Sequence, residues 1–223
     1  MIVFWFLQRN GTTFGDGTVN SFTGQNDYRQ INRVHTFNNQ TSTHFPGICG
    51  AIDGSADGFF PPYTIDQSAK TPSEMPDSVK LFTHQACRYM TYVKEEANAG
   101  VHYGLPYQEY QLDNRTFANE TVYEPNSCFR NDIPTGMQNN SFCGGENVPL
   151  FLSFPHFYTA DEYYIRQFSN KSDINPSREL HGSLLRLDPV MSALVFFKFS
   201  LQLNVKIYPM PRQAITTTII TRF

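Results

Sequence analysis

Residues 197–208 read FKFSLQLNVKIY, and apolar and polar side chains alternate strictly along this stretch. Successive side chains of an extended strand point to opposite faces, so the pattern predicts a single half-buried strand. At about 3.3 Å per residue it would span roughly 40 Å, which is typical of a large antiparallel sheet or barrel. The expected apolar face carries Phe197, Phe199, Leu201, Leu203, Val205 and Ile207.

Four shorter stretches also have the composition of strands, at residues 79–82, 89–93, 148–154 and 183–187. Turn-forming Gly, Pro, Asp and Asn residues separate them. We expect two short helices, at 84–92 and 159–168, and the first of these competes with the strand at 89–93. Neither a repeat nor a linker divides the chain, so the sequence predicts one mainly β unit with short helices.

The composition argues against one class of partner. Only 17% of the residues are charged, the formal net charge is −3, and the chain contains no basic block. Proteins that track nucleic-acid phosphates carry clustered Lys and Arg. We therefore expect no nucleic-acid partner.

Cysteines and glycosylation acceptors together suggest an oxidising compartment. Cys49, Cys87, Cys128 and Cys143 are widely spaced and form no zinc-type pair, which suits two disulfides in any of three pairings. Four buried thiols in a cytosolic protein are the alternative. Acceptor sequences Asn-x-Ser/Thr, more than chance would give, occur at Asn10, Asn39, Asn114, Asn119, Asn139 and Asn170. Both features favour a lumenal or extracellular location.

We expect no signal peptide and no transmembrane helix in this sequence. Residues 1–7 (MIVFWFL) are apolar but lack the charged segment and length of a signal peptide. The sequence has no apolar run of 18 residues, the length that would suggest a transmembrane helix. These observations predict a fragment or a truncated product.

His156 is the most conspicuous candidate for chemistry, because it lies within FLSFPHFYTAD at 151–161. It could be a base, a metal ligand or a buried imidazole hydrogen-bonded to the backbone, and we favour the last, since no partner residue lies at a telling spacing. The sequence contains no GxSxG, HExxH or phosphate-binding glycine loop, and the acidic turn at 53–58 lacks EF-hand spacing. We predict no catalytic residue, no metal and no cofactor, with a secreted hydrolase as a remaining alternative.

Six segments resemble those of the class B scavenger receptors, the family of the fatty-acid translocase, the high-density-lipoprotein receptor and lysosomal integral membrane protein type 2. The segment at 148–157 (VPLFLSFPHF) is similar to the family's "P-hydrophobic-x-S-x-PHF" element, and TADE at 159–162 looks most like the lysosomal member. The others, in matching order, are 7–27, 49–62, 86–88, 104–110 and 175–189.

The resemblance implies a fold and a disulfide pairing. Family members have a glycosylated ectodomain between two membrane spans, similar to an irregular antiparallel β-barrel with a hydrophobic tunnel. Residues 1–209 resemble the later half of this domain, so the barrel would be incomplete, and 210–223 form a divergent tail. Position in the family implies the pairs Cys49–Cys128 and Cys87–Cys143, without the third bridge of some members.

The function implied is that of a membrane receptor without catalytic activity. It would bind fatty acid, sterol, phospholipid or lipoprotein ligands and pass lipid through the tunnel, which the alternating face of 197–207 would line. Between the two roles of that face, we favour ordinary core packing over lining the tunnel. A lysosomal-membrane receptor that carries a hydrolase is the alternative function.

Overall fold

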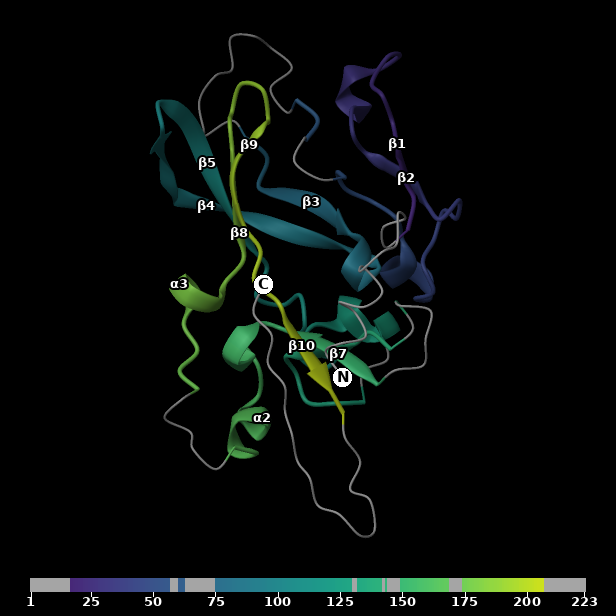
Figure 1. Ribbon diagram of the computed structural model, residues 1–223, viewed down its shortest axis with the longest axis vertical. Helices are drawn as coiled ribbons and strands as arrows, with labels where there is room; N and C mark the ends of the chain where they lie inside the picture. Colours follow the sequence, from purple (N-terminus) through teal and green to yellow (C-terminus); the bar gives the residue numbers. More distant parts are fainter. Residues whose placement is uncertain are drawn as a thin grey trace, which may run out of the picture.

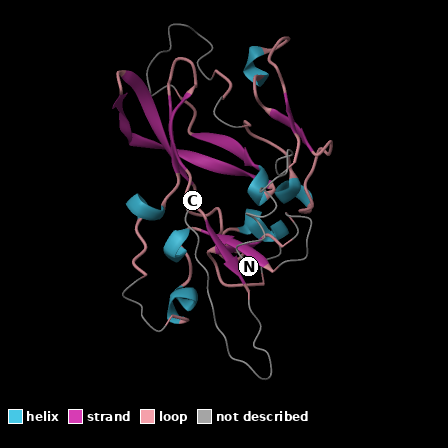
Figure 2. Ribbon diagram, in the orientation of Figure 1, coloured by secondary structure: helices cyan, strands magenta, loops and turns pink. Residues whose placement is uncertain are grey.

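The computed structural model describes residues 17–56, 60–62, 75–129, 132–141, 143, 149–168 and 174–206. This part of the chain is mainly β, with short helices (Figures 1 and 2). The strands are β1 (Val19–Ser21), β2 (Val34–Phe37), β3 (Ser78–Thr83), β4 (Arg88–His102), β5 (Leu105–Leu112), β6 (Met137–Asn139), β7 (Leu150–Ser153), β8 (Leu184–Leu187), β9 (Leu194–Lys198) and β10 (Gln202–Val205). The α-helices are α2 (Glu162–Arg166) and α3 (Arg178–His181). The short 3-10 helices are η1 (Tyr28–Gln30), η2 (Gly47–Gly50), η4 (His84–Ala86), η5 (Glu124–Phe129) and η6 (Pro155–Phe157).

The strands form three antiparallel sheets. The largest has the order β3-β4-β5-β8-β9, the second has the order β10-β7-β6, and β1 pairs with β2. The five-stranded sheet is curled and open, with β3 at one edge and β9 at the other. This arrangement is consistent with the incomplete barrel that the family resemblance implies.

The single long strand expected at 197–208 is wrong. The stretch contributes to two strands, because β9 pairs with β8 in the large sheet while β10 pairs with β7 in the second sheet. Between them Ser200 leaves the ladder: its N–H donates to Ser183 Oγ at 2.9 Å, and that hydroxyl donates back to Ser200 O at 3.1 Å. Alternation reports an extended backbone but not its partner, so it cannot reveal that the chain changes sheets.

The polar face of β10 is buried, contrary to the expected orientation. Gln202 and Asn204 are 0% and 6% exposed, whereas Phe197 and Val205 on the apolar face are each 39% exposed. Gln202 Nε2 donates to Asn204 Oδ1 at 2.7 Å, and Asn204 Nδ2 donates to Ser153 Oγ at 3.0 Å. Because these buried amides are hydrogen-bonded, the polar face lies inside without a large desolvation penalty.

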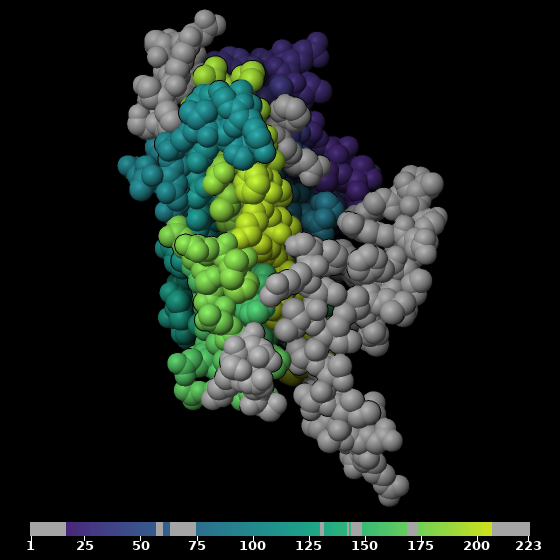
Figure 3. Space-filling view, turned by 60° about the vertical axis from the view of Figure 1, so that its left-hand side comes forward, coloured from purple at the N-terminus to yellow at the C-terminus, as the bar shows by residue number. Residues whose placement is uncertain are grey.

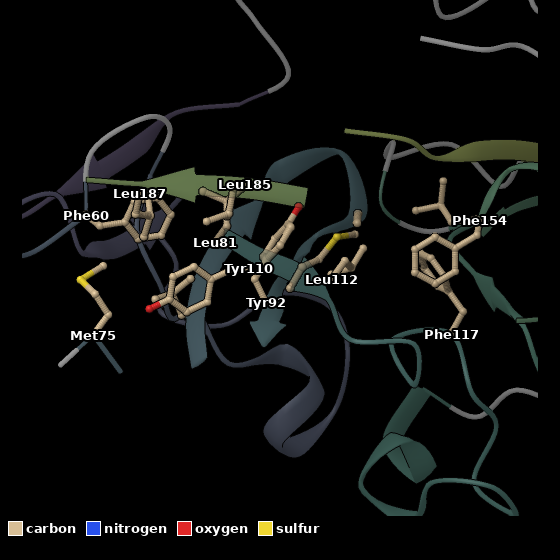
Figure 4. Close-up of a cluster of buried hydrophobic side chains, with 14 residues drawn as sticks. Phe60, Met75, Leu81, Tyr92, Tyr110, Leu112, Phe117, Phe154, Leu185 and Leu187 are labelled. Carbon is tan, nitrogen blue, oxygen red and sulfur yellow. The ribbon is translucent and has the colours of Figure 1, made fainter. Parts of the chain in front are cut away.

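The main core covers one face of the large sheet (Figure 4). Alternate residues of β3, β4, β5 and β8 supply it, among them Leu81, Met90, Tyr110 and Leu185. Phe117 and Phe154 lie at one end of this cluster, with their rings edge-to-face at 5.1 Å. The helix predicted at 84–92 is wrong beyond η4, because Met90 and its alternate neighbours are needed on this face and the segment is therefore extended.

Two buried tyrosines of the core make a matched stability test. Tyr92 and Tyr110 are both 0% exposed, but Tyr110 Oη donates to Pro76 O at 2.8 Å, whereas the Tyr92 hydroxyl has no partner within the described residues. Burial raises the pKa of Tyr92, so its phenol is protonated at neutral pH and lacks an acceptor. Tyr92→Phe is expected to raise the free energy of unfolding by about 1 kcal/mol, and Tyr110→Phe to lower it by about the same amount. Urea denaturation of both variants checks this, and an equal loss in both would contradict it.

Candidate functional site: an apolar hollow between the sheet edges

The curl of the large sheet brings its two edge strands to one hollow of about 200 Å³. Both β3 and β9 contribute to its wall, and Leu185 of β8 lies between them. The lining residues are Phe60, Leu81, Phe82, Thr83, His84, Gln85, Leu185, Leu194, Phe197 and Phe199. A volume this small is below the roughly 300–1,000 Å³ of a complete small-molecule pocket, so the hollow accommodates a segment of an apolar chain.

The hollow has an apolar part and a polar end. Leucines and phenylalanines from β3, β8, β9 and the segment after β9 form the apolar part. Thr83, His84 and Gln85, at the end of β3 and in η4, form the polar end. Phe60 joins from a distant segment and is held by its N–H, which donates to Ser192 O at 3.4 Å. The site is therefore amphipathic along its length.

Only some of the residues predicted to line a tunnel lie in the wall of the hollow. Phe197 and Phe199 line the hollow, with ring centroids 5.6 Å apart. Leu201 and Leu203 are half-buried against the main core, Val205 is exposed, and Ile207 lies outside the described residues. In Figure 3 the yellow surface of the C-terminal strands lies beside the teal surface of the earlier strands. Phe197 and Val205 are each 39% exposed, so part of the predicted apolar face is open to solvent.

Other lining residues were not among the predicted site residues. Leu81 and Leu185 lie in strands that composition did predict, but nothing in their own segments indicates that they face the same space. Their proximity depends on the curl of the sheet, which a single sequence does not encode in any local pattern. Thr83 lies in the same strand as Leu81 and carries no motif.

Two disulfides fix the segments around the site. Cys49 is bonded to Cys128 and Cys87 to Cys143, the same pairs that the resemblance implies. Cys87 directly follows η4, so its bond ties the polar end of the hollow to the segment after β6. Cys49–Cys128 joins η2 to η5, and both bonds pack in one cluster with Phe45, Phe82 and Phe129.

His156 is a structural element of the turn after β7. Its backbone is left-handed, with φ of 54°, and its N–H donates to Gln202 Oε1 at 2.9 Å. The half-buried imidazole stacks on that of His181, with centroids 4.3 Å apart. Within the described residues there is no group of three or more His, Cys, Asp or Glu side chains placed to hold a metal ion. The ring therefore packs two segments together.

Four of the six acceptor asparagines lie in the described part of the chain. Asn39 and Asn114 are exposed, while Asn119 and Asn139 are half-buried; Asn10 and Asn170 lie outside the described residues. The exposed pair leaves room for an attached glycan without displacing packed side chains.

Removing either exposed acceptor is expected to remove one glycan. Asn39→Gln and Asn114→Gln, made in a secretory host, should each increase electrophoretic mobility, and digestion with an N-glycosidase should abolish the differences. Asn98→Gln is the control, because Asn98 is exposed but begins no acceptor sequence. Identical mobility of all variants before digestion would show that neither site is used.

These features place the protein among disulfide-bonded β proteins with an apolar hollow in a curled sheet. The model of the CD36 family matches residues 3–221, so the chain belongs to this family, the class B scavenger receptors. It is 32% identical over 204 residues to scavenger receptor class B member 1 of Sus scrofa, with 91% of this chain and 37% of that protein aligned.

Two other relatives extend the comparison. The chain is 31% identical to Protein peste of Drosophila melanogaster, over 91% of this chain and 35% of that protein. It is 27% identical to lysosome membrane protein 2 of Mus musculus, over 89% of this chain and 39% of that protein. The chain thus spans little more than a third of the length of these relatives. None of the helices in the described ranges is long and apolar enough to cross a membrane.

Proposed function

We propose that this chain is the lipid-binding part of a scavenger-receptor-like membrane glycoprotein, with the hollow forming part of a passage for lipid. The observation that carries the proposal is the hollow itself, whose apolar wall is supplied by both edges of one curled sheet. Burial of hydrocarbon against such a wall is favourable by about 25 cal/mol per Å². Binding and transfer, without bond chemistry, is the activity that this surface supports.

Two further features support an extracellular or lumenal position for this region. Both disulfides are bonds of an oxidising compartment, and Asn39 and Asn114 are exposed acceptors for glycans. One relative is named a scavenger receptor and another a lysosome membrane protein. These names fit a receptor of the plasma membrane or of the lysosomal membrane. The ligands we propose are fatty acids, sterols or phospholipids, free or presented by lipoproteins.

Filling the hollow should prevent binding. Leu194 is half-buried in its wall, so Leu194→Trp places a larger side chain in the space that a ligand chain needs. We expect the affinity for a fluorescent long-chain fatty acid to fall at least about tenfold, equivalent to about 1.4 kcal/mol. The measurement is a fluorescence titration of the chain purified from a secretory host.

The control adds the same side chain away from the hollow. Val101 is 69% exposed near the end of β4, and Val101→Trp should leave the affinity unchanged. Circular dichroism verifies that both variants are folded. Equal affinity of wild type and Leu194→Trp would refute the hollow as the binding site.

A further inference from the structure

The hydroxyl of Thr83 is a buried polar group that stabilises no other part of the described fold. Thr83 is 5% exposed, and its Oγ1 has no hydrogen-bond partner within the described part of the chain. Leaving a hydroxyl buried and unbonded costs about 1–3 kcal/mol, and a valine would have the same shape without that cost. The same residue lines the hollow at its polar end. A group that costs stability in a binding wall is best explained by a ligand that bonds to it.

The surroundings of Thr83 favour an anionic partner. Thr83 pairs directly with Arg88 across β3 and β4, so the two side chains leave the sheet on the same face. The guanidinium of Arg88 donates to three neutral acceptors, and no carboxylate among the described residues pairs with it. Gln138, which accepts one of those bonds, also has a buried Nε2 without a partner in the described ranges. The cross-strand neighbour of Thr83 thus carries a positive charge that no described carboxylate compensates, and a further unpaired donor lies next to that neighbour.

We infer that Thr83 is the contact for the polar head of the ligand, and that this head is a carboxylate. This inference rests on the proposed function and specifies the orientation of the ligand in the hollow. The carboxylate oxygen accepts a hydrogen bond from Thr83 Oγ1, and the hydrocarbon chain lies along Leu81, Leu185 and Phe197. A rotation of Thr83 about χ1 between staggered positions exchanges the hydroxyl and the methyl, which directs the donor into the hollow.

Thr83→Val tests the contact without endangering the fold. The substitution keeps the side-chain shape and removes only an unbonded hydroxyl, so the free energy of unfolding should stay equal or rise. Affinity for hexadecanoate should fall about tenfold, the value of one hydrogen bond to a charged group. Affinity for diphenylhexatriene, a hydrocarbon probe without a head group, should not change. Thr83→Ser retains the hydroxyl and should retain the affinity for hexadecanoate.

Each other outcome overturns a specific statement. If wild type binds neither hexadecanoate nor diphenylhexatriene, the proposed function fails before Thr83 is tested. If wild type binds both and Thr83→Val weakens both equally or neither, Thr83 does not contact the head group. If hexadecanol binds as well as hexadecanoate and loses as much affinity in Thr83→Val, the recognised head is a neutral hydroxyl and the carboxylate assignment is wrong.

Discussion

Replacing Arg88 by alanine is expected to lower the free energy of unfolding by about 3–5 kcal/mol, one of the two largest effects we predict for this chain. The guanidinium joins three parts of the chain, because it donates to Tyr89 O at 3.2 Å, Thr116 O at 3.1 Å and Gln138 Oε1 at 2.7 Å. It also stacks on Phe129 at 4.0 Å from the ring centroid. Alanine removes all of these contacts and leaves buried acceptors behind.

The cost of burying the charge opposes this effect but does not cancel it. Burial lowers the pKa of Arg88 to about 10, which leaves the side chain charged at physiological pH. That shift corresponds to a penalty of roughly 3 kcal/mol in the folded state. Three hydrogen bonds from a charged donor, at about 1.5–3 kcal/mol each, and the stacking on Phe129 exceed it. The net effect of Arg88 on the folded state is therefore stabilising.

A double variant distinguishes the loss of the Arg88–Gln138 hydrogen bond from the cost of leaving Gln138 Oε1 buried without a donor. Arg88→Met alone leaves Gln138 Oε1 buried without its donor, whereas Arg88→Met with Gln138→Leu removes both members of the pair. The double variant should recover about 1–2 kcal/mol relative to Arg88→Met in urea denaturation. A double variant less stable than Arg88→Met would show that Gln138 is anchored by contacts other than Arg88.

The sequence predicted the strands better than their partners. Composition and turn residues located β3, β7 and β8 to within a few residues, and alternation indicated that 197–208 is extended. It failed to detect the transfer of the chain at Ser200 from one sheet to the other, because both halves of the stretch keep the same period. It also assigned Gln202 and Asn204 to solvent, although their mutual hydrogen bond allows them to be buried. The partner of a strand and the hydrogen bonds of its buried polar side chains depend on the tertiary structure, so the periodicity of the sequence does not predict them.

The sequence predicted only those residues of the candidate site that lie in the C-terminal alternating stretch. Phe197 and Phe199 could be proposed because they lie in a conspicuous pattern, whereas Leu81, Thr83 and Leu185 join them through the curl of the sheet. His156 is a conspicuous residue for which the sequence favoured a structural role over chemistry, and its backbone N–H and ring contact Gln202 and His181. A side chain without a motif, such as Thr83, can be proposed as a ligand contact only when its burial and missing partner are known.

Loss of the Cys87–Cys143 bond is expected to lower the free energy of unfolding by about 4 kcal/mol. The bond closes a loop with a sequence separation of 56 residues, and the chain-entropy model gives about this value for such a loop. The same model predicts a comparable loss, about 4–5 kcal/mol, for the Cys49–Cys128 bond, whose separation is 79 residues. Stability measurements on Cys87→Ser/Cys143→Ser and Cys49→Ser/Cys128→Ser should therefore give similar results.

Lipid binding should distinguish these two variants, because only the Cys87–Cys143 bond involves a residue that directly follows a segment lining the hollow. Cys87 follows η4 directly, and η4 supplies His84 and Gln85 to the polar end, whereas Cys49 and Cys128 contribute nothing to the lining. At a temperature where both variants remain folded, affinity for hexadecanoate should fall in Cys87→Ser/Cys143→Ser and stay near the wild-type value in Cys49→Ser/Cys128→Ser. An equal loss of affinity in both would mean that binding depends on the stability of the whole domain, and the placement of the head group beside η4 would then lose its support.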